Sequence, residues 1–515
     1  MNFTVKPLNF LPINHWKKAL SFATSLLLHS ERRKPAMAST SPLVVDFEEA
    51  GSEAEGVSGF MSKFIDVNEA RTQLLFSVPM ILTNMSYYAV TLVAVMFAGH
   101  LGDVELAGAT LGNSWGTVTG LSLMTGLSGA LETLCGQGYG AKLYRMLGIY
   151  LQSSIILTTF ASVIVSILWY FSEPVLILLH QDPSVAKMAT IYLRFLIPGL
   201  FAYAYLQCLV RFLQTQSLVV PLVICSLLPL VFDVGLTYLF VHTLGLGFIG
   251  ASLASSISLW ISVFMLAIYV NYSEKFRYTW EGLSMESFQH VLPSLKLATS
   301  SALMICLEYC AFEILVLLAG LMPNSENSTS LVAMCVQTEA IAYMITYGFS
   351  AAVSTRVSNE MGAGNIKKAK NAVSVTLKLS FFLALTFLLS LAFGQKIWAK
   401  SFTTNAMIIK DFASMTPLLS VSILLDSAQG VLSGVSRGCG WQHLAAWTNL
   451  ACFYLVGMPV ALLFGFKLGF YDKGLWLGLI CGLFCQATTL LVITIRSKWT
   501  KLDLVAQDEK NRLLV

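Results

Sequence analysis

"TGLSGALETLCGQGYGA", residues 125–141, returns 222 positions later as "YGFSAAVSTRVSNEMGA", residues 347–363. The two stretches share six of their seventeen residues. The shared residues are glycine, alanine, serine and threonine, so an abundance of large apolar residues does not explain the match. Weak self-similarity at a fixed offset indicates an internal repeat. The identical positions are Gly126/Gly348, Ser128/Ser350, Ala130/Ala352, Thr133/Thr355, Gly140/Gly362 and Ala141/Ala363.

The composition around this repeat is that of a membrane protein. The chain has 515 residues, of which 56% are hydrophobic and 12% are charged, whereas a soluble domain carries about 25% charged residues. A net charge of +4 is too small to indicate a nucleic-acid partner. We therefore expect the lipid bilayer to be the main surrounding of the chain.

Twelve apolar runs are long enough to cross a bilayer as helices, which takes about 20 residues each. A transmembrane β-barrel would instead show alternating segments of about ten residues. The predicted fold class is therefore all-α and integral to the membrane. The predicted spans are 74–98, 107–134, 146–171, 189–210, 218–242, 247–270, 294–321, 331–354, 374–394, 412–434, 444–466 and 474–495.

The repeat divides these spans into two halves of six, because helix starts recur at nearly the same offset. Six is an even number, so both halves enter the membrane in the same sense and form parallel repeats, an architecture typical of transporters. The predicted divisions are a variable N-terminal tail, an N-lobe, an inter-lobe loop, a C-lobe and a C-terminal tail. Their bounds are 1–64, 65–270, 271–293, 294–497 and 498–515.

Charge distribution predicts the orientation. If both termini are cytosolic, the inside segments hold 23 Lys and Arg residues and the outside loops hold six. Because Lys and Arg favour the cytosolic side, we predict cytosolic N- and C-termini. The first 64 residues are basic and then acidic, and we expect them to be disordered. Whether residues 1–36 are a targeting peptide or follow a misassigned start is left open.

Four motifs resemble those of plant multidrug and toxic compound extrusion (MATE) transporters, and the likeness extends over about residues 65 to 497. The resemblance implies two six-helix lobes around a central cleft. It also implies a secondary antiporter that expels small organic compounds in exchange for H⁺ or Na⁺, with H⁺ typical of plant members. We expect a monomer without a cofactor. The motifs are "CGQGYGAKLY" (135–144), "CLEYCAFE" (306–313), "STRVSNEMGAGN" (354–365) and "LDSAQGVLSGVSRGCGWQ" (425–442).

Coupling to protons requires an ionisable group inside the membrane, where an unpaired charge is costly and a carboxylate readily takes up a proton. Four of the six acidic residues in the predicted spans lie in the second half, which favours an ion site in that lobe. The six are Glu132, Asp233, Glu308, Glu313, Glu339 and Asp426.

Glu308 and Glu313 lie on the seventh predicted span. Five residues separate them, so they point about 140° apart and cannot share one helix face. The resemblance carries Glu308 over as a proton or substrate carboxylate and Glu313 as a second candidate. The alternative is that both are buried acids satisfied by neighbouring hydroxyls or amides.

Glu339 has Tyr343 and Tyr347 four and eight residues later on the same helix face. An acid beside aromatic rings suits a planar or cationic substrate. We therefore predict that this face lines the cleft, although ordinary packing also produces aromatic stripes.

Asp426 and Gln429 are i,i+3 neighbours in the tenth span, within a motif that matches the plant pattern. We predict that Asp426 belongs to the ion site and that Gln429 lines the cleft. Gln207 aligns with Gln429 at offset 222 and is predicted to line the matching wall of the N-lobe. Asn84 is the polar feature of the first span, where many microbial relatives place an acid.

Glu132 lies close to the cytosolic end of the second span, so we expect it to pair with a loop Lys or Arg rather than to carry protons. Asp233 has no predicted role. Arg356, Asn359 and Glu360 are too close to the membrane edge for a midplane site. We expect these three residues in an inner gate or at a helix end.

The predicted function is proton-coupled export of a small organic compound, from the cytosol outward or into a vacuole. Na⁺ coupling and flipping of a lipid-like substrate are alternatives within transport. A membrane enzyme is a poorer interpretation, because the seven histidines are scattered and no nucleophile motif is present in the sequence. The ten cysteines contain no CxxC pair and fit packing positions.

Overall fold

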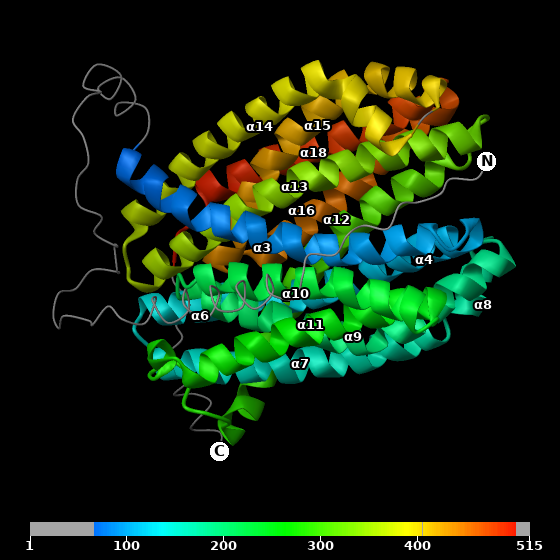
Figure 1. Cartoon of the computed structure of the whole chain (residues 1–515). Coiled ribbons are helices and arrows are strands. Elements are labelled where there is room, and N and C mark those ends of the chain that lie inside the picture. The colour runs from blue at the N-terminus through cyan, green and yellow to red at the C-terminus, as the bar shows by residue number, and fades with distance from the viewer. Residues whose placement is uncertain (1–65, 404, 501–515) are drawn as a thin grey trace, which may run out of the picture. The chain divides into compact units, whose positions relative to one another are not determined.

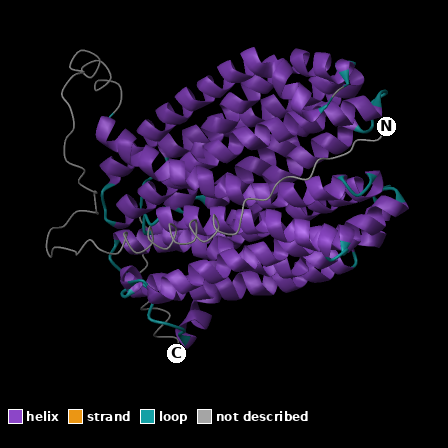
Figure 2. Cartoon of the chain, viewed as in Figure 1, coloured by secondary structure: helices purple, strands orange, loops and turns teal. Residues whose placement is uncertain are grey.

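The computed structural model describes residues 66–403 and 405–500, and within these ranges every regular element is a helix (Figure 2). The predicted all-α class is confirmed. The predicted N-terminal tail, and the C-terminal tail beyond Thr500, lie outside the described residues.

The first half of the chain, here called the N-half, runs from α3 to α11. Its second predicted span is not one helix but a run of four helical segments, α4, η1, α5 and α6. The N-half helices are α3 (Val67–Gly99), α4 (Asp103–Gly116), η1 (Thr117–Leu121), α5 (Ser122–Ser128), α6 (Ala130–Gly140), α7 (Tyr144–Tyr170), α8 (Ser172–Leu178), α9 (Pro183–Thr215), α10 (Val220–Tyr238), η2 (Leu239–Thr243) and α11 (Gly247–Tyr272).

The second half, called the C-half, runs from α12 to α18 and follows a loop with two short helical turns, η3 (Glu274–Phe276) and η4 (Met285–His290). Its fifth predicted span is again made of several consecutive segments. The C-half helices are α12 (Val291–Ala319), α13 (Ser325–Gly362), α14 (Ile366–Phe402), α15 (Ala406–Cys439), α16 (Gln442–Asn449), η5 (Leu450–Gly457), α17 (Met458–Leu462), η6 (Leu463–Lys467) and α18 (Tyr471–Arg496).

Within the described residues, eleven helices are long and apolar enough to cross a membrane, judged by length and composition. The remaining predicted span, 107–134, is the segmented run α4 to α6. Several helices extend well past their predicted spans, such as α13 with 38 residues. Backbone hydrogen bonds continue a helix through polar residues, so the end of an apolar run does not mark the end of the helix.

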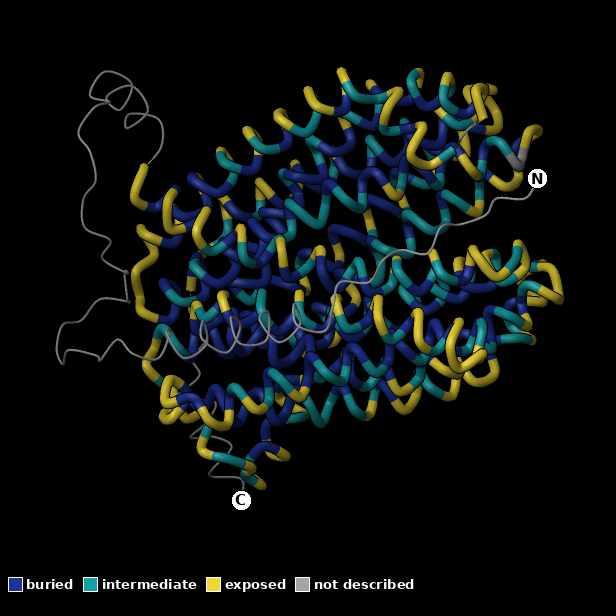
Figure 3. Tube along the Cα trace, viewed as in Figure 1, coloured by how far each residue is buried: buried dark blue, intermediate teal, exposed yellow. Residues whose placement is uncertain are grey.

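Helix α3 lies at the boundary between the two halves, where it packs on α10 of its own half and on α13 of the C-half (Figure 1). Each half has its own buried aromatic side chains, including Trp169 and Phe212 in the N-half and Trp476 and Phe412 in the C-half. Exposed residues lie mainly on the outer sides of the helices (Figure 3). Many of these exposed residues are large and apolar, which suits contact with lipid.

The inter-lobe loop is fastened to the N-half. Phe276 is buried in the N-half core. The side chain of Gln152 on α7 donates to the carbonyl of Gly282 (2.8 Å) and accepts from the backbone amide of Ser284 (2.8 Å). A carboxylate of this loop, Glu286, also pairs with Arg145. The loop therefore forms part of the N-half fold as far as η4.

Proline positions differ between the halves. Pro79 lies inside α3, whereas Ser300, 221 residues later on α12, has a hydroxyl that donates to the Lys296 carbonyl of its own helix (2.9 Å). Pro198 and Pro417 lie inside helices α9 and α15.

Candidate functional site: a carboxylate cluster and an interlobe ion-pair cluster

The C-half contains a buried carboxylate cluster centred on Gln429. The side-chain nitrogen of Gln429 donates to a carboxylate oxygen of Glu308 (2.8 Å) and to one of Asp426 (2.7 Å). Glu308 is 8% exposed and Asp426 is 3% exposed. The structure thus brings together three residues that the sequence analysis had placed in the site, and one amide links the two acids.

Further amides surround Glu308. The side chain of Asn449 donates to the Met304 carbonyl (2.7 Å) and more weakly to Glu308 (3.4 Å). Gln486 in turn donates to Asn449 (2.9 Å). Asn449 and Gln486 were not predicted as site residues, although an amide inside an apolar span is itself a signal of a buried polar site.

Glu339 lies beside this cluster but has different direct partners. It accepts a hydrogen bond from Ser422 (2.9 Å), which also accepts one from the indole of Trp476 (3.1 Å). The other carboxylate oxygen of Glu339 is buried without a hydrogen-bond partner among the described protein atoms. Ser422 precedes Asp426 by one turn of α15, so α15 connects Glu339 to the carboxylate cluster.

The polar residues of α15 form one stripe along the helix. They are spaced by four, three, four and four residues, which keeps them on one face. The hydroxyl of Ser433 donates to the side-chain oxygen of Gln429, one turn earlier in the helix (3.0 Å). The stripe covers sixteen residues, and its two ends lie about 22 Å apart along the axis. Its members are Ser422, Asp426, Gln429, Ser433 and Arg437.

The remaining predicted site residues lie elsewhere. Glu313 faces the N-half and accepts a hydrogen bond from Ser114 on α4 (2.8 Å). It therefore shares no direct partner with Glu308. Gln207 is buried on α9. Asn84 is half-buried on α3, and its side-chain nitrogen has no partner within the described chain.

Tyr343 and Tyr347 lie one turn apart on α13, with ring centroids 5.8 Å apart and ring planes tilted by 40°. Both side chains are half-buried. The ring of Tyr347 lies close to two guanidinium groups, those of Arg211 (5.4 Å) and Arg437 (5.6 Å). The face that carries Glu339 therefore leads along α13 toward a second buried charged site.

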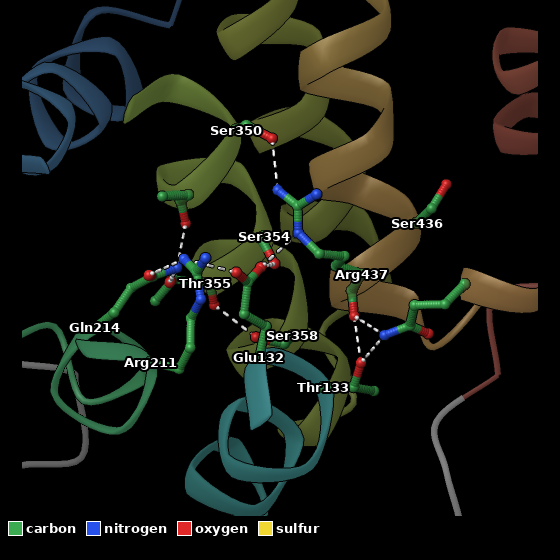
Figure 4. Close-up of polar contacts among 12 residues, drawn as sticks. Glu132, Thr133, Arg211, Gln214, Ser350, Ser354, Thr355, Ser358, Ser436 and Arg437 are labelled. Carbon is green, nitrogen blue, oxygen red and sulfur yellow. Dashed lines mark hydrogen bonds and ion pairs between the residues drawn. The ribbon is translucent and has the colours of Figure 1, made fainter. Parts of the chain in front are cut away.

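This second site is an ion-pair cluster of three charges, Glu132, Arg211 and Arg437 (Figure 4). One oxygen of Glu132 lies 3.0 Å from a guanidinium nitrogen of Arg211, and the other lies 2.9 Å from Nε of Arg437. Glu132 is 0% exposed, Arg211 2% and Arg437 1%. The predicted partner type was correct but its location was wrong: both arginines lie on long helices, and neither belongs to a loop.

The ion-pair cluster joins the two halves of the chain. Glu132 on α6 and Arg211 on α9 belong to the N-half, whereas Arg437 on α15 belongs to the C-half. Ser354 on α13 donates to Glu132, and Arg211 donates to the hydroxyl of Tyr347. The cluster is therefore an interface as well as a charge site.

Close backbone packing accompanies these contacts. A Cβ atom on Gly140 would meet the Asn359 carbonyl far inside van der Waals contact, and one on Gly362 would meet the Gln137 carbonyl in the same way. Gly362 is the repeat counterpart of Gly140, and Asn359 is the counterpart of Gln137, each at offset 222. The contact is thus reciprocal, as in an interface with two-fold symmetry.

The predicted gate residues also bridge the halves. Arg356 on α13 donates to both carboxylate oxygens of Glu69 at the start of α3 (3.1 Å each) and pairs with Glu360 (2.9 Å). Asn359 donates to the carbonyl of Thr215 on α9 (3.1 Å).

The two buried sites differ in their charge partners. Glu132 has two arginines, whereas no basic side chain of the described ranges forms an ion pair with Glu308, Glu339 or Asp426. Buried carboxylates without a cationic partner can exchange protons or attract a cationic ligand, while a carboxylate between two arginines stays occupied by them.

Asp233 on α10 is a further buried acid, with 0% exposure. Neither of its carboxylate oxygens has a hydrogen-bond partner within residues 66–403 and 405–500. It lies in the N-half, apart from both sites.

Known proteins match nearly the whole described chain. The family model described as MatE matches residues 79–239 and 300–463, one segment in each half. Protein DETOXIFICATION 18 of Arabidopsis thaliana is 59% identical over 445 residues, covering 86% of this chain and 95% of the relative. Protein DETOXIFICATION 16 of the same plant is 43% identical over 445 residues, with 86% and 91% covered.

Solved structures agree with the sequence matches. A crystal structure titled as the eukaryotic MATE transporter AtDTX14 superposes with a TM-score of 0.82 at 36% identity, covering 87% of this chain and 99% of that one. An outward-facing MATE family transporter superposes with a TM-score of 0.74 at 19% identity, covering 83% and 96%, which is a likeness of fold. The predicted fold class is confirmed, and the chain belongs to the multidrug and toxic compound extrusion (MATE) family of membrane transporters.

Proposed function

We propose that this transporter is a secondary active antiporter that exports small organic compounds from the cytosol in exchange for protons. The observation that carries the proposal is the carboxylate cluster in the C-half. There, one amide of Gln429 holds Glu308 and Asp426 together, without a basic partner in the described chain. Such a pair of acids can take up a proton from one side of the membrane and release it to the other.

Substrate and proton would use overlapping groups in this proposal. Protonation of Glu308, Glu339 or Asp426 from the outside releases the substrate, and deprotonation on the inside restores substrate binding. Glu313 is kept as a weaker candidate for the same role. Tyr343, Tyr347, Gln429, Gln207 and Asn84 are proposed to line the substrate path.

The two halves act as lobes in this proposal, residues 65–270 and 294–497, joined by the loop 271–293. Their rocking exposes the site alternately to the two sides, as is typical of transporters built from repeats. We place the N- and C-termini in the cytosol and the protein in the plasma membrane or the vacuolar membrane.

The test replaces Glu308 by Gln in the full-length protein reconstituted in vesicles. Ethidium serves as a planar cationic probe, and an imposed pH gradient drives its transport. We expect Glu308→Gln to abolish gradient-driven transport while the variant still inserts in the membrane. Glu274→Gln, the same change at an exposed loop carboxylate, should transport at the parent rate. Full activity of Glu308→Gln would refute the site assignment.

The coupling ion is tested in the same vesicles by changing the driving force. Transport should stop when the pH gradient is collapsed and should persist when Na⁺ is replaced by K⁺. Transport that survives collapse of the pH gradient but needs Na⁺ would instead favour the Na⁺-coupled alternative. Movement of a fluorescent phospholipid between leaflets, in place of ethidium, would favour a flippase.

A further inference from the structure

The two arginines that hold Glu132 belong to different halves. Arg211 comes from α9 in the N-half, the same half as Glu132, and its ion pair measures 3.0 Å. Arg437 comes from α15 in the C-half, and its ion pair measures 2.9 Å. Of these two pairs, only the one with Arg437 crosses the interface (Figure 4).

If the halves separate where α6 meets α15, the two arginines will therefore move differently relative to Glu132. Arg437 would leave with the C-half, where Ser350 on α13 already accepts a hydrogen bond from it (2.8 Å). Arg211 would stay beside Glu132. A buried charge that loses its only partner is strongly destabilising. With two arginines, Glu132 has a partner in both arrangements.

We propose that the Glu132–Arg437 pair is an interlobe latch, and that Arg211 is a positioning residue that keeps Glu132 paired when the latch is open. The inference rests on the alternating motion of the lobes proposed above and assigns parts to it. The latch opens when the lobes separate at this end and closes when they meet.

Neighbouring contacts hold the latch in register. The hydroxyl of Thr133 donates to the backbone carbonyl of Arg437, and Gln442 donates to Thr133 (2.7 Å). Gln137 donates to the carbonyl of Gly438 (3.1 Å). These bonds fix the end of α15 against α6, so Arg437 returns to the same place whenever the helices meet.

Arg437 also ends the polar stripe of α15, which begins near Glu339 and passes through Asp426 and Gln429. One helix therefore carries both the proposed proton site and the C-half side of the latch. A shift of α15 along or about its axis moves both together, so the latch is placed to respond to events at the carboxylate cluster.

A single replacement of Arg211 cannot test its role, because Arg211 has an interface contact of its own with the hydroxyl of Tyr347. The experiment is therefore a pair of double-mutant cycles, in which such side effects cancel. One cycle combines Glu132→Gln with Arg437→Gln, and the other combines Glu132→Gln with Arg211→Gln.

The measured quantity is the ratio of separated to closed populations, read as distances between spin labels by double electron–electron resonance. The labels replace Lys275 on η3, which is fixed to the N-half, and Lys368 at the start of α14, both of which are exposed. The full-length protein carries alanine at its half-buried cysteines, and no substrate or gradient is present. These cysteines are Cys306, Cys310, Cys481 and Cys485.

We expect the Glu132–Arg437 cycle to show a coupling of at least about tenfold in this ratio, within the range known for contacting charges. The Glu132–Arg211 cycle should show less than about a threefold coupling, because that pair is intact in both arrangements. Equal couplings in the two cycles, or none between Glu132 and Arg437, would overturn the proposal. Because the ratio is read without transport, failure of proton coupling would leave this result unaffected.

A milder pair of variants covers the case in which the charge variants do not fold. Ser354→Ala removes an interface hydrogen bond to Glu132 and leaves all three charges in place. Ser436→Ala is the matched control, because the hydroxyl of Ser436 donates within its own helix to Leu432 (3.0 Å). Ser354→Ala should raise the separated population by at least about tenfold, as expected for a bond to a charged group. A change no larger than that of Ser436→Ala would contradict the latch.

Discussion

Replacing Gly140 by alanine should open the end of the molecule at which α6 meets α13. A Cβ atom at this position would meet the carbonyl oxygen of Asn359 well inside contact distance, with the Asn359 carbonyl carbon at 2.8 Å and the Ala363 nitrogen at 3.0 Å. These are backbone atoms of the other half, so no side chain can rotate away. The two helices must move apart.

The expected magnitude follows from two opposing effects. Overpacking a closely fitted contact costs about 1–3 kcal/mol. Alanine in a helix is favoured over glycine by about 1 kcal/mol, but α6 is helical whether or not the halves touch, so this gain cancels from the ratio of the two states. The separated population should therefore rise about 5- to 150-fold relative to the closed one.

Gly138→Ala on the same helix is the matched control. Its Cβ would lie 3.2 Å from the terminal methyl of Leu147, which belongs to the same half and can move. The spin-label ratio defined above should change with Gly140→Ala and not with Gly138→Ala. Gly362→Ala, the repeat counterpart, should act in the same direction, and the double variant should add little once the helices are apart. An unchanged ratio in Gly140→Ala would refute the close-contact argument.

Three further changes have defined outcomes. Gln429→Leu removes the donor that Glu308 and Asp426 share (2.8 and 2.7 Å). Because each bond to a charged group contributes about 1.5–3 kcal/mol, we expect at least about a tenfold loss of gradient-driven ethidium transport. Transport at the parent rate would count against the shared bridge. Arg356→Gln removes the guanidinium that pairs with both Glu69 and Glu360, whose side chains are only 9% and 7% exposed, so thermal unfolding should reveal a loss of more than about 1 kcal/mol, and a smaller loss would contradict this. Hydrogen bonds from the side chain of Ser184 and from the backbone lower the pKa of Asp182, which caps α9. The stabilisation by this charge is therefore present above the unfolded pKa of about 3.9 and is lost as the pH falls through the lower folded pKa. Asp182→Asn should show a flatter decline in melting temperature than the parent below about pH 4, and parallel curves would argue against the charge.

Much of the fold could be predicted from the sequence, because hydropathy and the repeat act at the level of whole helices. A run of apolar residues must lie in lipid or in a core, and a six-helix offset determines the relative sense of the two halves. The division of the second span into α4, η1, α5 and α6 was not predictable, because local breaks in a helix depend on the neighbours that accept its free backbone groups.

The candidate site could be predicted only in part, because spacing within one helix is visible in the sequence and contacts between helices are not. Asp426 and Gln429 share a face of one helix, and that spacing is visible in the sequence. The amide of Asn449 on α16 reaches Glu308, and that of Gln486 on α18 reaches Asn449, and such contacts between helices depend on tertiary packing.

Arg211 and Arg437 were not predicted as site residues because both follow the end of a predicted span, Arg211 by one residue and Arg437 by three. Predicted spans end where hydropathy falls, so both residues fell outside them. The structure continues α9 to Thr215 and α15 to Cys439, which buries both guanidinium groups inside the protein. Glu132, 79 positions from Arg211 and 305 from Arg437, gave no local sign of either partner.

Glu132 and Ser354 are counterparts in the repeat, 222 residues apart, and they are hydrogen-bonded to each other. Two equivalent positions can touch only where the pseudo-two-fold axis passes between them. In a dimer of two identical chains, a residue at such a point faces its own copy, so a glutamate there would confront a second glutamate at close range. Fusing the two copies into one chain removes that restriction: one copy can carry the acid while the other carries a hydroxyl that binds it. The ion pairs around Glu132 are therefore a form of asymmetry that two fused copies can adopt and that a symmetric dimer of identical chains cannot.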